Sequence, residues 1–149
     1  MYRLRRWRME VKASRESILA ELARRRAVSC LGTALESYSS YYRPDEVSFY
    51  SIDLPGDESS DRLRKWFQVL GPGVARVRCY HLDSRKHGRR EAASGDWKQV
   101  VKRLERIGFL ERSGIHVRTT KIQTVIDLFC DGKAFAAREL LRELWGIDV

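Results

Sequence analysis

The sequence predicts an α+β fold, with a small mixed β-sheet packed by long helices and a helical carboxy-terminal lobe that contains a β-hairpin. Short segments that alternate apolar and polar residues, as strands do, stand among longer segments with apolar residues every three or four positions, as in helices. Hydrophobic residues make up 43% of the 149 residues, which excludes global disorder. A chain of this length buries roughly two-thirds of its unfolded surface and needs no disulfide or metal to fold.

The amino-terminal region predicts a strand followed by one long helix. Trp7, Met9 and Val11 alternate with polar residues, which gives a strand one apolar and one basic face. Ser14 is placed as the N-cap of a helix that runs to about Ser37. The apolar stripe of this helix consists of Ile18, Leu22, Leu31 and Leu35.

Two further strands and a second helix are expected before residue 83. The segment 47–54 is apolar and β-prone, and the Pro55-Gly56 turn ends it. Ser59 or Ser60 caps the second helix, whose apolar residues recur with helical spacing at Leu63, Trp66, Phe67 and Leu70. After a glycine-proline turn, the segment 75–80 alternates again and predicts a strand with Arg76, Arg78 and Tyr80 on its outer face.

The carboxy-terminal part is expected to be mainly helical. A polar, basic loop over 83–94 precedes a helix that opens at Asp96 and ends at Gly108. The segment 109–118, with Ser113-Gly114 at its middle, predicts a hairpin. Two short helices, at 121–130 and 134–145, complete the chain, with Cys79, Cys130 and the tryptophans assigned to the core.

The basic loop divides the chain into an α/β part at 1–82, a loop or linker at 83–95 and a helical part at 96–149. A single domain over 1–149 is the alternative. The long first helix and the tyrosine cluster at 38–42 offer an apolar face on which a homodimer could form.

The charge of the protein is concentrated in two stretches. The chain has 29 Lys and Arg against 20 Asp and Glu, a formal net charge of +9. Residues 1–12 hold five basic residues and one acid, and residues 76–103 hold nine and three. Several cations on one surface are what phosphate neutralisation requires, so the expected partner is nucleic acid.

The candidate nucleic-acid-binding residues fall into two groups. The strand and loop surface combines guanidinium groups, which bind phosphates, with a tyrosine that can stack on a base. Its members are Arg6, Arg8, Arg76, Arg78, Tyr80, Arg85, Lys86, Arg89 and Arg90. The polar side of the helix after Asp96 supplies Lys98, Lys102, Arg103 and Arg106.

The last 55 residues or so resemble winged helix-turn-helix DNA-binding proteins. The segment "DWKQVVKRLERIGFLERSGIHVRTT" looks like a recognition helix that runs into a wing, and "IQTVIDLFCDGKAFAARELLRELWGI" looks like the first two helices of the motif. In that family those two helices precede the recognition helix, whereas here they follow the hairpin. The resemblance implies contacts to DNA from the helix and from Arg112 and Arg118 on the wing.

A metal-dependent nuclease is the enzymatic alternative. Glu10 and Lys12 lie two apart on a predicted strand and resemble the Glu-x-Lys element of restriction-endonuclease-like nucleases, where the acid holds a metal and the lysine activates water. That family also needs an upstream Asp, and no acid precedes Glu10. Asp45, Asp53 or Asp57 would complete only a rearranged site.

The remaining patterns exclude other classes. Three widely spaced cysteines form no disulfide framework or zinc knuckle, and no cofactor motif occurs, so neither metal nor cofactor is expected. No apolar run is as long as a membrane span, and the protein is expected to be intracellular, either cytoplasmic or nucleoid-associated. The sequence therefore predicts a non-catalytic nucleic-acid-binding protein, for DNA ahead of RNA, with a basic structural protein that meets an acidic protein partner as a further alternative.

Overall fold

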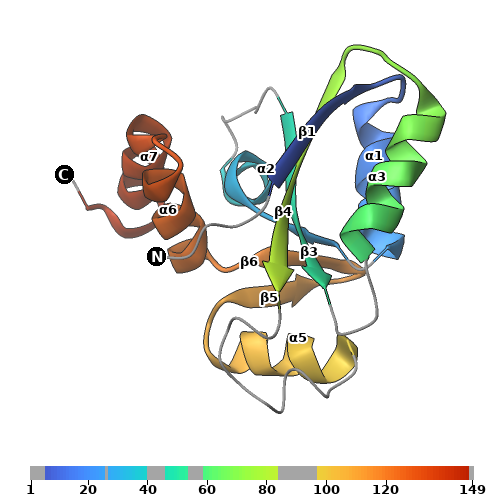
Figure 1. Cartoon of the computed structure of the whole chain (residues 1–149). Helices are drawn as coiled ribbons and strands as arrows, with labels where there is room; N and C mark the ends of the chain where they lie inside the picture. The colour runs from blue at the N-terminus through green and yellow to red at the C-terminus, as the bar shows by residue number, and fades with distance from the viewer. Residues whose placement is uncertain (1–5, 26, 40–45, 54–58, 84–96, 148–149) are drawn as a thin grey trace.

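The computed structural model describes residues 6–25, 27–39, 46–53, 59–83 and 97–147, and these residues form one six-stranded sheet with helices on both faces (Figure 1). The prediction of an α+β fold is confirmed. In chain order the elements are β1 (Arg6–Val11), α1 (Arg15–Arg24), β2 (Ala27–Ser29), α2 (Leu31–Tyr38), β3 (Glu46–Asp53), α3 (Ser59–Leu70), β4 (Ala75–Asp83), α5 (Trp97–Arg106), β5 (Leu110–Ser113), β6 (His116–Thr119), α6 (Lys121–Cys130) and α7 (Ala134–Trp145).

The sheet runs across both parts of the chain. Its strand order is β1-β4-β3-β2-β6-β5. The pairs β3–β4 and β2–β6 are parallel, and the other three pairs are antiparallel. Because β2 pairs with β3 on one side and β6 on the other, the predicted hairpin β5–β6 continues the sheet of the amino-terminal part.

Each face of the sheet carries its own hydrophobic core. Helices α1 and α3 cover one face and bury Phe49 and Val77 of the central strands, together with Phe67 of α3. The opposite face carries Tyr50 and Tyr80 and packs against α2, α5, α6 and α7. The alternation of side chains along β3 and β4 therefore supplies both cores, as expected for strands in the middle of a sheet.

The predicted long helix over 14–37 is wrong. Helix α1 begins at Arg15, with Ser14 as its N-cap as predicted, and ends at Arg24. Continuing the apolar stripe beyond Leu22 would require an apolar residue near position 26, and the sequence has arginine there. The chain instead forms β2 and then α2, so the apolar face assigned to one long helix is divided between the two cores.

The helices and the hairpin of the carboxy-terminal part form at their predicted positions, but several side chains predicted to be buried are exposed. The hairpin turns at Gly114, which has a positive φ of 63°. Cys130 and Trp145 were assigned to the core, and both are exposed. In the expected stripe of α6, Val125 is buried, whereas the other three residues, Ile122, Ile126 and Phe129, point to solvent.

Candidate nucleic-acid interface

Helix α5 carries an exposed row of cations above a buried apolar face. Its core contacts come from Val100, Val101 and Leu104, all buried as predicted. On the solvent side stand Lys98, Lys102 and Arg106, each four positions after the last and therefore on one side of the helix. We call these three residues the α5 cation row. Arg103, which was expected to be exposed, is half-buried.

The described residues provide no carboxylate partner for the α5 cation row. Within the ranges that the structure describes, no Asp or Glu oxygen lies within 4.0 Å of a side-chain nitrogen of Lys98, Lys102 or Arg106. The acid of the same helix, Glu105, instead pairs with Arg112, whose Nε lies 2.8 Å from its Oε1. Among the described residues the row therefore forms a strip of net positive charge along the exposed side of α5.

The two arginines predicted on the wing are both paired. Arg112 meets Glu105, and Arg118 donates to Glu111 at 3.0 Å while its guanidinium lies 4.3 Å from the centre of the Tyr38 ring. Arg118 keeps only 22% of its side chain exposed. These contacts place Arg112 beside α5 and make Arg118 part of the packing between the hairpin and α2.

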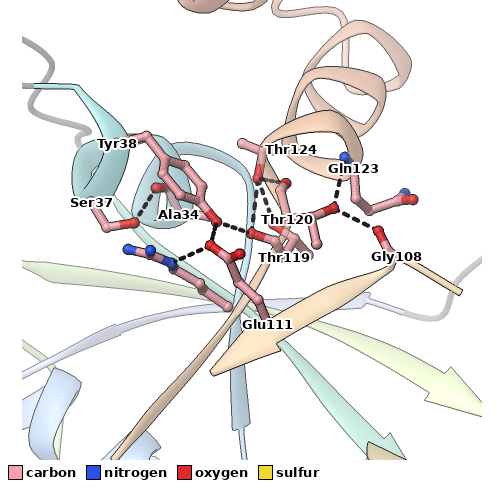
Figure 2. A network of polar contacts seen from close by, with 10 residues as sticks. Ala34, Ser37, Tyr38, Gly108, Glu111, Thr119, Thr120, Gln123 and Thr124 are labelled. Carbon is pink, nitrogen blue, oxygen red and sulfur yellow. Dashed lines mark hydrogen bonds and ion pairs between the residues drawn. The ribbon is translucent and has the colours of Figure 1, made fainter. Parts of the chain in front are cut away.

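Figure 2 shows the polar network that fixes the hairpin to its neighbours. The Tyr38 hydroxyl on α2 lies 2.5 Å from Oε1 of Glu111 and 2.7 Å from the carbonyl oxygen of Thr119, and it donates to them. Burial raises the pKa of this hydroxyl well above its usual range, and its hydrogen bond to Glu111 adds to the rise. Tyr38 therefore stays protonated and keeps donating at all physiological pH values.

The start of α6 is fixed to the end of α5. The Thr120 hydroxyl accepts from the backbone N–H of Gln123 at 3.2 Å, as an N-cap does, and donates to the carbonyl of Gly108 at 2.6 Å (Figure 2). The buried hydroxyls of Thr119 and Thr124 lie 2.7 Å apart. Helix α5, the hairpin and α6 are thus held together by hydrogen bonds as well as by the core.

The expected basic outer face of β4 is wrong for two of its three members. Arg78 is 1% exposed and Tyr80 is 8% exposed. Arg78 forms a bidentate pair with Asp131 and a further ion pair with Glu46 at 3.2 Å, and the Tyr80 hydroxyl donates to Asp131 at 3.0 Å. The alternating pattern predicted that this face of the sheet is polar and exposed, but the end of α6 covers it. Neither Arg78 nor Tyr80 can therefore reach a nucleic acid.

Asp127 of α6 extends this buried cluster. The Tyr50 hydroxyl and the Gln123 amide donate to Asp127 at 3.0 and 2.9 Å. Burial raises the pKa of Asp127 to about 6, although both hydrogen bonds oppose the rise. The sequence signal for this cluster is the pair of acids, Asp127 and Asp131, four positions apart in the largely apolar segment 122–132, and the sequence analysis did not use it.

The other members of the strand and loop surface are only partly described. Arg8 is exposed on β1 directly opposite Arg78, and Arg76 is exposed with its Nε 3.7 Å from Glu10. The side chain of Arg6 lies outside the described residues. So do the four basic loop residues Arg85, Lys86, Arg89 and Arg90.

The described residues of the alternative nuclease site are Glu10, Lys12 and the backbone of Asp53, and these do not lie together. Glu10 and Lys12 are both exposed at one end of the sheet, where the register aligns Glu10 with Arg76 and Arg76 with Glu46. Asp53 is seven residues further along β3, roughly 23 Å away at ~3.3 Å per residue. Asp45 and Asp57 lie outside the described residues.

Neither a metal cluster nor a membrane helix occurs in the described residues. Among them, no three His, Cys, Asp or Glu side chains lie close enough together to hold a metal ion. No helix within these ranges combines the length and the apolar character needed to cross a bilayer. Comparison of the chain with protein-family models, with curated proteins and with solved structures finds no match.

Proposed function

We propose that this protein binds nucleic acid without catalysis, and that the α5 cation row is a main contact surface. One observation carries the proposal, namely that Lys98, Lys102 and Arg106 form an exposed row without carboxylate partners in the described residues. Segment 97–106 has four basic residues and one acid, and that acid is engaged by Arg112. A row of this kind attracts phosphates and releases their counterions.

The contacts that hold α5 in place also support a role in recognition. Its three buried residues and the contacts of the hairpin fix the helix, so its exposed side needs little ordering on binding. An α-helix fits the major groove of B-DNA, where lysine and arginine reach both phosphates and guanine edges. Together with the resemblance to winged-helix proteins, this puts duplex DNA ahead of RNA as the proposed partner.

A nuclease is the weaker candidate. Among the described residues the one acid that could complete its site, Asp53, lies seven residues along β3 from the level of Glu10, and Glu10 pairs with Arg76. An acidic protein partner remains an outcome of the binding test. It would be indicated by a lack of affinity for every nucleic acid tried.

The test compares two variants that remove the same charge from different helices. One replaces the α5 cation row with alanine, and the other replaces three exposed cations of α3 on the opposite sheet face, Arg62, Arg64 and Lys65. Fluorescence anisotropy with labelled duplex DNA, single-stranded DNA and RNA at several salt concentrations gives log K against log salt. Loss of three phosphate contacts is expected to reduce the slope on duplex DNA by roughly 2.7. The α3 variant should keep the slope of the unmodified protein.

Thermal unfolding of both variants separates binding from folding. Both are expected to melt within a few degrees of the unmodified protein, because the substituted side chains are exposed. Equal slopes for the α5 variant and the unmodified protein would remove α5 from the interface. No binding of any nucleic acid by the unmodified protein would refute the proposed function as a whole.

A further inference from the structure

The ion pair of Glu105 and Arg112 lies beside the α5 cation row. Glu105 follows Lys98 by seven positions and Lys102 by three, so helical spacing places it on the same side of α5 as both lysines. Arg112 belongs to β5, and its Nε donates to Oε1 of Glu105 at 2.8 Å. The pair therefore joins the hairpin to the side of the helix that carries the row.

The guanidinium of Arg112 is held at one nitrogen and open at the other two. Its side chain is 47% exposed, and among the described residues Nη1 and Nη2 have no acceptor. A guanidinium carries its N–H donors in one rigid plane, so a bond through Nε leaves those of Nη1 and Nη2 for another acceptor. Arg118, the other arginine of the hairpin, is 22% exposed and lies against the Tyr38 ring. Arg112 is therefore the one of the two that can contact a bound molecule.

The charge of the pair separates it from the row. The α5 cation row attracts phosphates, whereas Arg112 and Glu105 together carry no net charge, and the carboxylate repels a phosphate. The acceptor atoms of a base edge are uncharged, so Glu105 repels them less. In the major groove guanine presents two acceptors, O6 and N7, which match two N–H groups of one guanidinium. The free edge of Arg112 therefore fits guanine better than phosphate.

We propose that Arg112 binds the major-groove edge of guanine beside α5, and that Glu105 is the positioning residue that holds its guanidinium. This role of Arg112 rests on the proposed function, because it requires DNA on the exposed side of α5. The α5 cation row supplies the contacts to phosphates, and Arg112 supplies the contact that depends on sequence. Ordering a free arginine on binding costs side-chain entropy, and the hydrogen bond to Glu105 restricts this side chain before DNA arrives.

A pool of duplex DNA with randomised central base pairs tests whether the full chain prefers guanine. Duplexes that the protein enriches are expected to share a guanine at one fixed position. Replacing it with 7-deazaguanine, which lacks N7 and keeps O6, should weaken binding at least about fivefold in fluorescence anisotropy. The same replacement at an unselected position should leave the affinity unchanged. Equal enrichment of all bases at every position overturns the proposal.

Variants of the pair assign the preference to its two members. Arg112→Lys keeps the charge but lacks the planar fork, so it should reduce the preference for guanine over adenine at least about fivefold and leave the salt slope unchanged. Glu105→Ala frees the guanidinium to bind phosphate, so the preference should fall and the slope should steepen by about 0.9. Glu105→Gln keeps an acceptor for Nε and should retain more of the preference than Glu105→Ala. Arg142→Lys, in the exposed pair with Glu139 on α7, is the matched control and should change neither quantity.

The outcomes separate failure of this role from failure of the proposed function. The melting temperatures of the variants are expected to change by a few degrees at most, because both side chains of the pair are accessible to solvent. A guanine preference that Arg112→Lys leaves intact overturns the proposal, and one that Glu105→Ala leaves intact removes the positioning role of Glu105. In either case a reduced salt slope in the α5 cation row variant still supports nucleic-acid binding by α5. If the unmodified protein binds no nucleic acid, both are refuted.

Discussion

Removing the charge of Asp131 should destabilise the protein far more than removing an exposed acid. In the folded state the Asp131 carboxylate accepts two N–H groups of Arg78 and the Tyr80 hydroxyl, and Arg78 is 1% exposed. Asp131→Asn leaves the buried guanidinium with Glu46 as its remaining carboxylate partner. Breaking a buried pair from one side costs about 3–5 kcal/mol, and because Glu46 stays we expect about 3 kcal/mol.

Replacing the partner residue, Arg78, and replacing both residues together test the same ion pair. Arg78→Met leaves Asp131 with 13% of its side chain exposed and the Tyr80 hydroxyl still donating, so we expect a loss of only about 1–2 kcal/mol. Removing both charges together should cost less than the sum of the single changes, because no unpaired charge stays buried. The measured coupling isolates the pair itself.

Urea unfolding followed by circular dichroism and tryptophan fluorescence measures these free energies. Glu139→Gln is the matched control, because it breaks the exposed pair with Arg142 and should cost at most about 0.5 kcal/mol. If the loss in the free energy of unfolding is the same for Asp131→Asn and Glu139→Gln within error, then Arg78 is solvated in solution. The buried cluster would then not fasten α6 to the sheet.

Two further outcomes follow from the described geometry. Asp127 has a pKa of about 6 in the folded protein against an ordinary value of 3.8, so its contribution to stability falls as pH rises between these values. In urea titrations across this range, the free energy of unfolding of Asp127→Asn should match that of the unmodified protein near pH 4. Above pH 6 it should be higher by up to about 3 kcal/mol. Gly73→Ala should cost about 1–3 kcal/mol in the same assay, because its Cβ would lie 2.5 Å from the Lys12 Cα, whereas Val74→Ala, 96% exposed, should cost little.

Periodicity predicted the elements that have a clear pattern of their own. The apolar side of α5 is buried as expected, because Val100, Val101 and Leu104 have helical spacing within one uninterrupted segment. Strand β2 was missed because it has only three residues, too few for alternation to be seen. Its place between β3 and β6 is set by partners far away in sequence, which no local pattern records.

Local sequence patterns also could not predict that Arg78 and Tyr80 are buried. Alternation correctly placed Arg78 and Tyr80 on the same side of β4, but it does not tell whether another element covers that side. The cover is Asp131, 53 residues later in the chain. Likewise, α6 has more apolar residues than one core-facing side can bury, and the sequence does not indicate which of them face outward.

Strand β2 has a consequence for the order in which this protein folds. Its partner β6 lies almost ninety residues later, since Val28 pairs with Val117. A pairing so distant in sequence is among the slowest to form, because a long loop must close first. Until β6 arrives, β2 presents an open edge of unpaired N–H and C=O groups beside the apolar residues of α2, and such an edge readily pairs with other chains. Fragments that end before His116 should therefore aggregate, and the hairpin β5–β6 is the element that closes the sheet against this.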